Sequence, residues 1–177
     1  KDDNDILFGS LPTAFSTRLA ALLPDPDPTP LGAALSGYDG ANAGSDAFTI
    51  SNVTGTISDI KFVADASGGA FTGQDSGLDT VGGVSVLLYT DPANNNILLG
   101  RAGGPSGAIV FAAYIEETAT GGKLWMVQYQ ALKHGTDPND YDDAITLANK
   151  VWIGVDQDAS FSLAGAPSGQ NLFLMFT

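Results

Sequence analysis

The sequence has no cysteine. This absence excludes a disulfide framework, and it excludes every metal site built on thiolates. Long apolar runs are missing as well. None reaches the roughly 18 residues of a membrane-spanning helix, so we expect no membrane insertion. Because no signal peptide is visible at Lys1, we expect this chain to be part of a longer one.

Positive charge is scarce. The chain has seven Lys and Arg against twenty Asp and Glu, which gives a net charge of −13, and it has a single histidine. A nucleic-acid partner needs a basic surface to meet its phosphates, so we expect no such partner. The same deficit argues against an electrostatic attachment to anionic membranes.

Glutamate is scarce too. Eighteen of the twenty acidic residues are Asp, and the two exceptions are Glu116 and Glu117. Acidic proteins rich in helices use Glu, which has the better helix propensity, whereas Asp is typical of turns, caps and calcium loops. Two interpretations remain open at this point: an acidic, loop-rich surface, or several Ca²⁺ sites. Bound Ca²⁺ would stabilise an extracellular protein that has no disulfides.

The length of 177 residues suits a single domain over residues 1–177, and with 44% hydrophobic residues it can bury a sizeable core. We assign residues 1–44 to an N-terminal arm. It has room for a strand and one short helix, followed by a Pro-rich extended linker over 24–30. Residues 45–177 are assigned to the core of the fold.

Strand-like runs separated by Gly, Pro, Asn and Asp fill the rest of the chain. Two hairpins are predicted: one from strands over 84–90 and 97–101, and one with its turn near Thr120, Gly121 and Gly122. Further strands are predicted over 47–53, 56–64, 144–156, 159–165 and 171–177. With no long amphipathic helix, the pattern predicts an all-β fold, an antiparallel β-sandwich with long calcium-binding loops.

Clusters of oxygen-bearing side chains are the candidate metal sites. No regular motif fits them: from Asp137, an EF-hand would need an acidic or amide residue where Tyr141 stands. We therefore expect irregular calcium sites in loops at strand ends, although turn formation alone also explains such residues. The clusters are Asp75, Ser76 and Asp79; Asp91 with Asn94, Asn95 and Asn96; Asp137, Asn139, Asp140, Asp142 and Asp143; and Asp156 with Asp158.

Catalytic patterns are weak, and we predict that the protein is not an enzyme. A Ser–His–Asp triad would have to use His134, but no Gly-x-Ser-x-Gly elbow exists, and a lone His at a strand end is more often structural. Arg101 is of more interest. A rare cation among acids can hold a ligand carboxylate or pair with a metal-site carboxylate, and a surface ion pair is the alternative. Tyr89 and Tyr141 are candidates to pack a bound peptide.

The order of motifs over residues 45–177 resembles a domain of giant repeats-in-toxin (RTX) adhesins of Gram-negative bacteria. The resemblance is carried by "DSGLDT", by the hairpin "VSVLLYTDPANNNILLGRAG", by "GAIVFAAYIEETATGGKLWMVQYQALKH", and by "DPNDYDDAITLANKVWIGVDQD" with the following "FSLAGAPSGQNLFLMF". One departure concerns Gln157, which lies between Asp156 and Asp158 where the pattern is expected to have Gly.

The resemblance implies a β-sandwich on a long, extracellular surface protein, held together by several Ca²⁺ ions. Some members of that group are peptide-binding domains, in which a terminal carboxylate meets a bound calcium; others are domains of unknown function. We therefore expect a calcium-dependent module that binds extended peptides or peptide ends on a host or neighbouring cell. A purely structural calcium-stabilised spacer and a carbohydrate-binding module are the alternatives.

Overall fold

Nine β-strands, one α-helix and one short 3-10 helix (Phe8–Ser10) make up the described part of the chain. The structure is a computed structural model, and it describes residues 6–51, 53, 55–134 and 146–158. All strand pairings are antiparallel. The predicted all-β, sandwich-like class is confirmed, and so is the short helix near the N-terminus.

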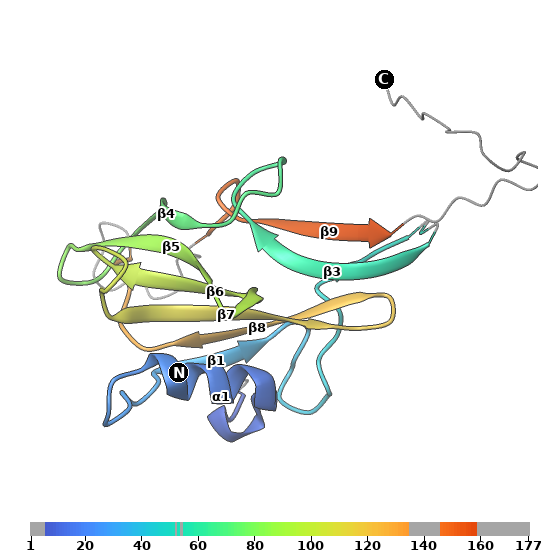
Figure 1. The fold of residues 1–177 in the computed structure, drawn as a ribbon. Coiled ribbons are helices and arrows are strands. Elements are labelled where there is room, and N and C mark those ends of the chain that lie inside the picture. The colour runs from blue at the N-terminus through green and yellow to red at the C-terminus, as the bar shows by residue number, and fades with distance from the viewer. Residues whose placement is uncertain (1–5, 52, 54, 135–145, 159–177) are drawn as a thin grey trace, which may run out of the picture.

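The strands form two sheets of unequal size (Figure 1). The main sheet has seven strands in the order β1-β8-β7-β6-β5-β4, and β2 pairs with β8 as well. The second sheet is the pair β3 (Thr56–Val63) and β9 (Trp152–Asp158). The main-sheet strands are β1 (Gly32–Leu35), β2 (Phe48–Thr49), β4 (Thr72–Asp79), β5 (Ser85–Asp91), β6 (Asn94–Ala102), β7 (Ile109–Glu117) and β8 (Gly121–Gln128).

Both predicted hairpins are confirmed. β5 pairs with β6 across Pro92 and Ala93, and β7 pairs with β8 across residues 118–120. The second turn needs glycine for a steric reason: a Cβ on Gly121 would lie 2.0 Å from the carbonyl oxygen of Phe48, in the neighbouring β2. Glycine at this point therefore allows β2 to approach the end of β8.

The two faces of the main sheet carry separate apolar clusters, because the central strands β6 and β7 are buried on both sides. One face is covered by α1 (Thr13–Leu22), whose Phe15 and Leu19 are fully buried. The other face is covered by β3, through Ile60 and Phe62. In Figure 1, α1 lies below β1 and β8, and β3 and β9 lie above β6 and β7.

The N-terminal segment contributes to the core as well as to the surface. Helix α1 stops before Pro24, which cannot continue it, and residues 24–30 are neither helix nor strand, as predicted. β1 then pairs with β8 at the edge of the main sheet. Residues 13–35 thus supply a helix, an edge strand and buried side chains to the same body as the rest.

Several predicted strands differ in extent from those observed. Of residues 47–53 only β2 is formed, while 56–64 corresponds to β3 and 144–156 to β9. β4 falls where a turn or metal loop was expected; it is an irregular edge strand with positive φ at Gly73 and Gly77. The predicted strands over 159–165 and 171–177 lie outside the described residues. No helix in the described part is long and apolar enough to cross a membrane.

Candidate functional site

Asp91 lies at the end of β5 and is almost fully buried, with 1% of its surface exposed. Arg18 of α1 donates to both of its oxygens, from Nε to Oδ2 at 2.6 Å and from Nη2 to Oδ1 at 2.6 Å. The bonded carboxylate of Asp91 raises the pKa of Arg18. A calcium ion at Asp91 would have to displace this bidentate pair. The calcium role of Asp91 stays a prediction, while its observed partner is an arginine that sequence analysis missed.

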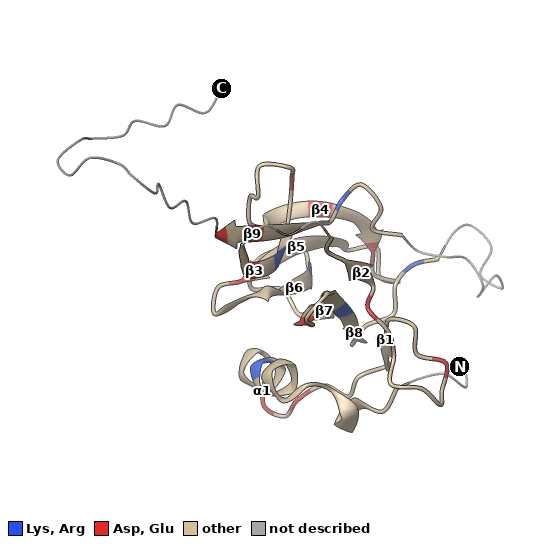
Figure 2. Ribbon diagram, turned by 90° about the vertical axis from the view of Figure 1, so that its right-hand side faces the viewer, with Lys and Arg blue, Asp and Glu red and all other residues tan. Residues whose placement is uncertain are grey.

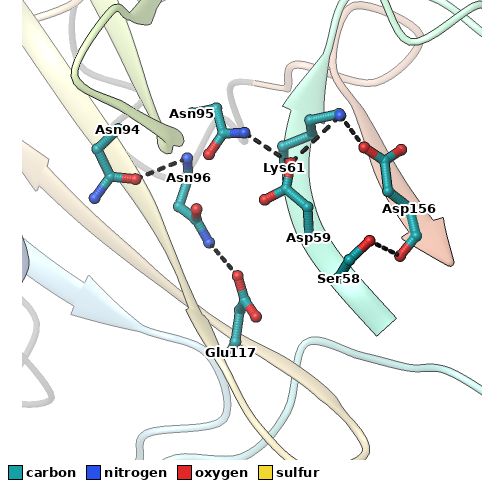
Figure 3. A network of polar contacts seen from close by, with 8 residues as sticks. All are labelled: Ser58, Asp59, Lys61, Asn94, Asn95, Asn96, Glu117 and Asp156. Carbon is teal, nitrogen blue, oxygen red and sulfur yellow. Dashed lines mark hydrogen bonds and ion pairs between the residues drawn. The ribbon is translucent and has the colours of Figure 1, made fainter. Parts of the chain in front are cut away.

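The Asn-rich start of β6 ties three strands together (Figure 3). Asn94 Oδ1 accepts from the backbone N–H of Asn96 at 3.0 Å. Asn95 Nδ2 donates to Asp59 of β3 at 2.7 Å, and Asn96 Nδ2 donates to Glu117 of β7 at 2.9 Å. The amide groups expected near Asp91 therefore connect β6 to the second sheet and to its neighbour in the main sheet.

Asp156 has a protein cation beside it. Lys61 of β3 lies between Asp156 of β9 and Asp59, with an ion pair to each and 3.3 Å between Nζ and Asp59 Oδ2 (Figure 3). The hydrogen bond to Asp156, more than the contact with Asp59, raises the pKa of Lys61. The amine supplies at Asp156 the positive charge that was expected from a metal. Asp158, two residues on, is exposed at the end of β9.

Asp75 is exposed on β4, and its Oδ1 accepts from the backbone N–H of Gly77 at 2.9 Å. Asp79, on the same strand, accepts from the hydroxyl of Ser85 at 3.0 Å. Across the ranges that the structure describes, no group of three or more His, Asp or Glu is placed to hold a metal. The calcium roles of Asp75, Asn94, Asp156 and Asp158 stay predictions.

The acidic segment after β8 contains the remaining candidates. Asp137, Asn139, Asp140, Tyr141, Asp142 and Asp143 all lie outside the described residues. His134 precedes this segment and is exposed. In Figure 2 the basic positions are few among the acidic ones, and one of them lies on α1.

Arg101 and Tyr89 lie on the face of the main sheet that α1 covers. Tyr89 is half-buried against the α1-side cluster. Arg101, at the end of β6, is half-buried, and its Nη1 donates to the carbonyl of Gly107 at 2.9 Å. Burial lowers the pKa of Arg101, while the nearby charges of Asp91 and Tyr89 act in the opposite direction. The alternative of a surface ion pair is not what the described residues show, since no carboxylate among them lies within ion-pair distance of Arg101.

The first half of β9, residues 152–155, is an exposed apolar surface that was not among the binding sites predicted from the sequence. In the described part of the chain β9 pairs with β3 alone, so no described strand covers its other edge along residues 152–155. Trp152, Ile153 and Val155 expose 50%, 38% and 39% of their surfaces. Ile153 and Val155 lie opposite Phe62 and Ile60, which are buried. They stay exposed because β3, rather than β9, makes the contacts with β6 and β7.

Comparison with known families and proteins gives a match to one family model. A family model matches residues 10–160, a range that runs from before α1 to the end of β9. No curated protein and no solved structure matches the chain.

Proposed function

Since the chain belongs to the family described as a domain of unknown function (DUF5801), we propose a function from its own surfaces and from the resemblance of its motifs. The proposal is a calcium-dependent ligand-binding module of a large bacterial surface adhesin, outside the cell. Its ligand is an extended peptide or peptide end on a host or neighbouring cell. The observation that carries this function is the exposed apolar half of β9, residues 152–155, at an edge that no described strand covers.

An open edge strand presents backbone N–H and C=O groups that lack a neighbouring strand, and an extended peptide can pair with them as an added strand. β9 also offers side chains for such a peptide. Trp152 points to one face of the strand and Ile153 and Val155 to the other, because successive residues alternate. Proteins usually protect such edges with charges or proline. β9 carries charge only at its end, on Asp156 and Asp158, so the exposed apolar residues among 152–155 favour a partner.

The excess of negative charge supports the calcium dependence in this proposal. Among the described acids, Asp91 is paired with Arg18, and Asp59 and Asp156 share the single charge of Lys61. A net charge of −13 leaves a large excess of carboxylates without such a partner, and oxygen-rich sites suit Ca²⁺. Asp75, Asp158 and the Asp-rich segment after His134 are the residues proposed to bind it.

Peptide binding is tested on a peptide array and by fluorescence polarisation with the peptides it yields. Trp152→Ala and Val155→Lys are expected to weaken binding at least tenfold, because they remove an apolar contact or place a charge on the β9 edge. Val81→Lys is the matched control, since Val81 is also an exposed apolar residue, at 68%, and lies between β4 and β5. Equal affinity in all three variants would show that peptides bind elsewhere.

Three other outcomes would each change the proposed function. If no peptide is enriched and calcium still raises the melting temperature, the domain is a structural spacer. If peptides bind only a chain cut after Asp158, then residues 159–177, which carry no charged side chain, are the natural occupant of the β9 edge. A signal on a glycan array in place of the peptide array would favour a carbohydrate ligand.

A further inference from the structure

A cavity of about 510 Å³ lies between the end of α1, the Pro-rich segment and the main sheet. Leu22, Leu23, Pro24 and Pro28 line one side of it, and Arg101, Ile109 and Tyr129 are on the sheet side. We propose that this cavity binds a small organic carboxylate with an apolar body. The site is on the opposite face of the main sheet from β3 and β9, so it goes beyond the peptide function proposed above and does not depend on it.

Arg101 is the group that recognises an anion. A guanidinium carries several N–H donors in a planar fork. The structure records one hydrogen bond from this group, to the carbonyl of Gly107. The carboxylate that acts on it most strongly is Asp91, whose two oxygens are already bonded to Arg18. Among the described residues this partly desolvated cation has no counterion of its own, which is unfavourable, so an anion that enters the cavity gains a charge-assisted contact.

The unpaired hydroxyl of Tyr129 is a second, independent observation that supports a ligand in this cavity. Only 6% of this residue is exposed, and its hydroxyl is a buried group with no hydrogen-bond partner among the residues that the structure describes. Burial, with a further contribution from Asp27, raises the pKa of Tyr129 to about 12. The hydroxyl therefore keeps its proton at neutral pH and can donate a hydrogen bond to a ligand. Buried polar groups are nearly always paired, so an unpaired hydroxyl on a residue that lines the cavity points to a ligand that would accept its hydrogen bond.

The walls define the rest of the ligand. Leu22, Leu23 and Ile109 offer aliphatic surface, and the two prolines add rigid apolar surface with few donors. An inorganic anion would leave these walls without a partner. A carboxylate carries two oxygens that match the guanidinium fork, and a short branched or aromatic body fills the apolar part. The volume is within the usual range for small-molecule pockets.

The test uses isovalerate as the probe, with isovaleramide as its uncharged counterpart and inorganic phosphate as the competing anion. Binding to the full chain is followed by isothermal titration calorimetry and by NMR shifts. We expect saturable binding of isovalerate and none of isovaleramide. Arg101→Met should weaken binding at least tenfold and Tyr129→Phe several-fold. Lys133→Met, which removes a cation outside the cavity, should leave binding unchanged.

Three results would overturn the proposal. Unchanged isovalerate affinity in Arg101→Met would show that the guanidinium does not hold the ligand. Equal affinity for isovaleramide would show that the charge of the carboxylate is not recognised. Tighter binding of phosphate than of isovalerate would show that the site prefers inorganic anions. If Arg101→Met does not fold, the variant Ala108→Trp tests whether isovalerate binds in this cavity. Ala108 is exposed and lines the cavity, so the indole should block entry of isovalerate, and binding that survives it would place the ligand elsewhere.

Discussion

At the scale of single residues, the structure pairs charges that are far apart in the sequence. Arg18 and Asp91 are 73 positions apart, and Lys61 and Asp156 are 95 apart. The acids are conspicuous in the sequence because most of its charged residues are Asp, whereas no local pattern marks the cations that pair with them. Arg18 on a short apolar helix carries no local sign that it faces a strand end. Lys61 alternates with apolar residues in β3 like any outward-facing side chain.

The Arg18–Asp91 pair makes a specific prediction. Arg18→Met leaves a fully buried carboxylate without its counterion, so it should lower the free energy of unfolding by about 3 kcal/mol, the lower end for a broken buried pair because Arg18 itself is 26% exposed. The double variant Arg18→Met/Asp91→Leu removes both charges and should recover most of that loss, because apolar replacement of a buried pair is often close to neutral. Urea unfolding of the two variants and the unmodified protein measures this. A double variant as unstable as the single one would mean that the pair itself, and not the orphaned charge, stabilises the fold.

Elements of structure were predictable where their contacts are local. The β5–β6 and β7–β8 hairpins follow from apolar runs on either side of Asp, Pro and Gly turns, because register in a hairpin is fixed by its own turn. β1 and β4 were not predicted. β1 is four residues long and depends on β8, nearly a hundred positions away. β4 is rich in Gly and Asp, and the buried hydroxyl of Ser76, which donates to Val86 at 2.6 Å, helps to hold it as a strand.

The pairing of β6 with β7 depends on one small residue. Gly100 lies opposite Phe111, and a Cβ added to Gly100 would be 2.4 Å from Cε1 of that ring. The ring is fully buried, so it cannot move aside freely. Gly100→Ala should therefore lower the free energy of unfolding by about 1–3 kcal/mol. Gly104→Ala is the matched control: no atom lies within 4 Å of its added Cβ, and we expect a change of about 0.5 kcal/mol or less. Thermal and urea unfolding compare the two, and similar losses would contradict the steric explanation.

At the scale of the whole molecule, composition shows that the chain is strongly acidic, but it does not show which carboxylates lie close together. The excess of Asp and the shortage of cations are visible in the sequence, and they predict a protein that gains from added positive charge. Which carboxylates gather in space depends on strand register. The register brings Asp59 and Asp156 to Lys61, and it separates both from Asp75 on the main sheet. The cavity at Arg101 was equally hidden, since it forms only when the segment after α1 packs on the sheet.

The net charge of −13 makes two explanations of calcium dependence compete, and one titration separates them. General screening weakens repulsion between carboxylates and depends on ionic strength alone, whereas a bound ion stabilises the folded state by mass action. A site saturated about 100-fold above its dissociation constant adds about 2.7 kcal/mol, which for a chain of this size raises the melting temperature by roughly 5–10 °C. We expect that shift with Ca²⁺, its reversal by EDTA, and a much smaller shift with NaCl at matched ionic strength. Replacing Asp137, Asp140, Asp142 and Asp143 by Asn should then remove the calcium-specific part, while the same change at Asp59, which already has an ion pair with Lys61, should leave it intact. Equal shifts of the melting temperature with Ca²⁺ and NaCl would show that the acidic residues only repel one another. Calcium would then have no part in the proposed function.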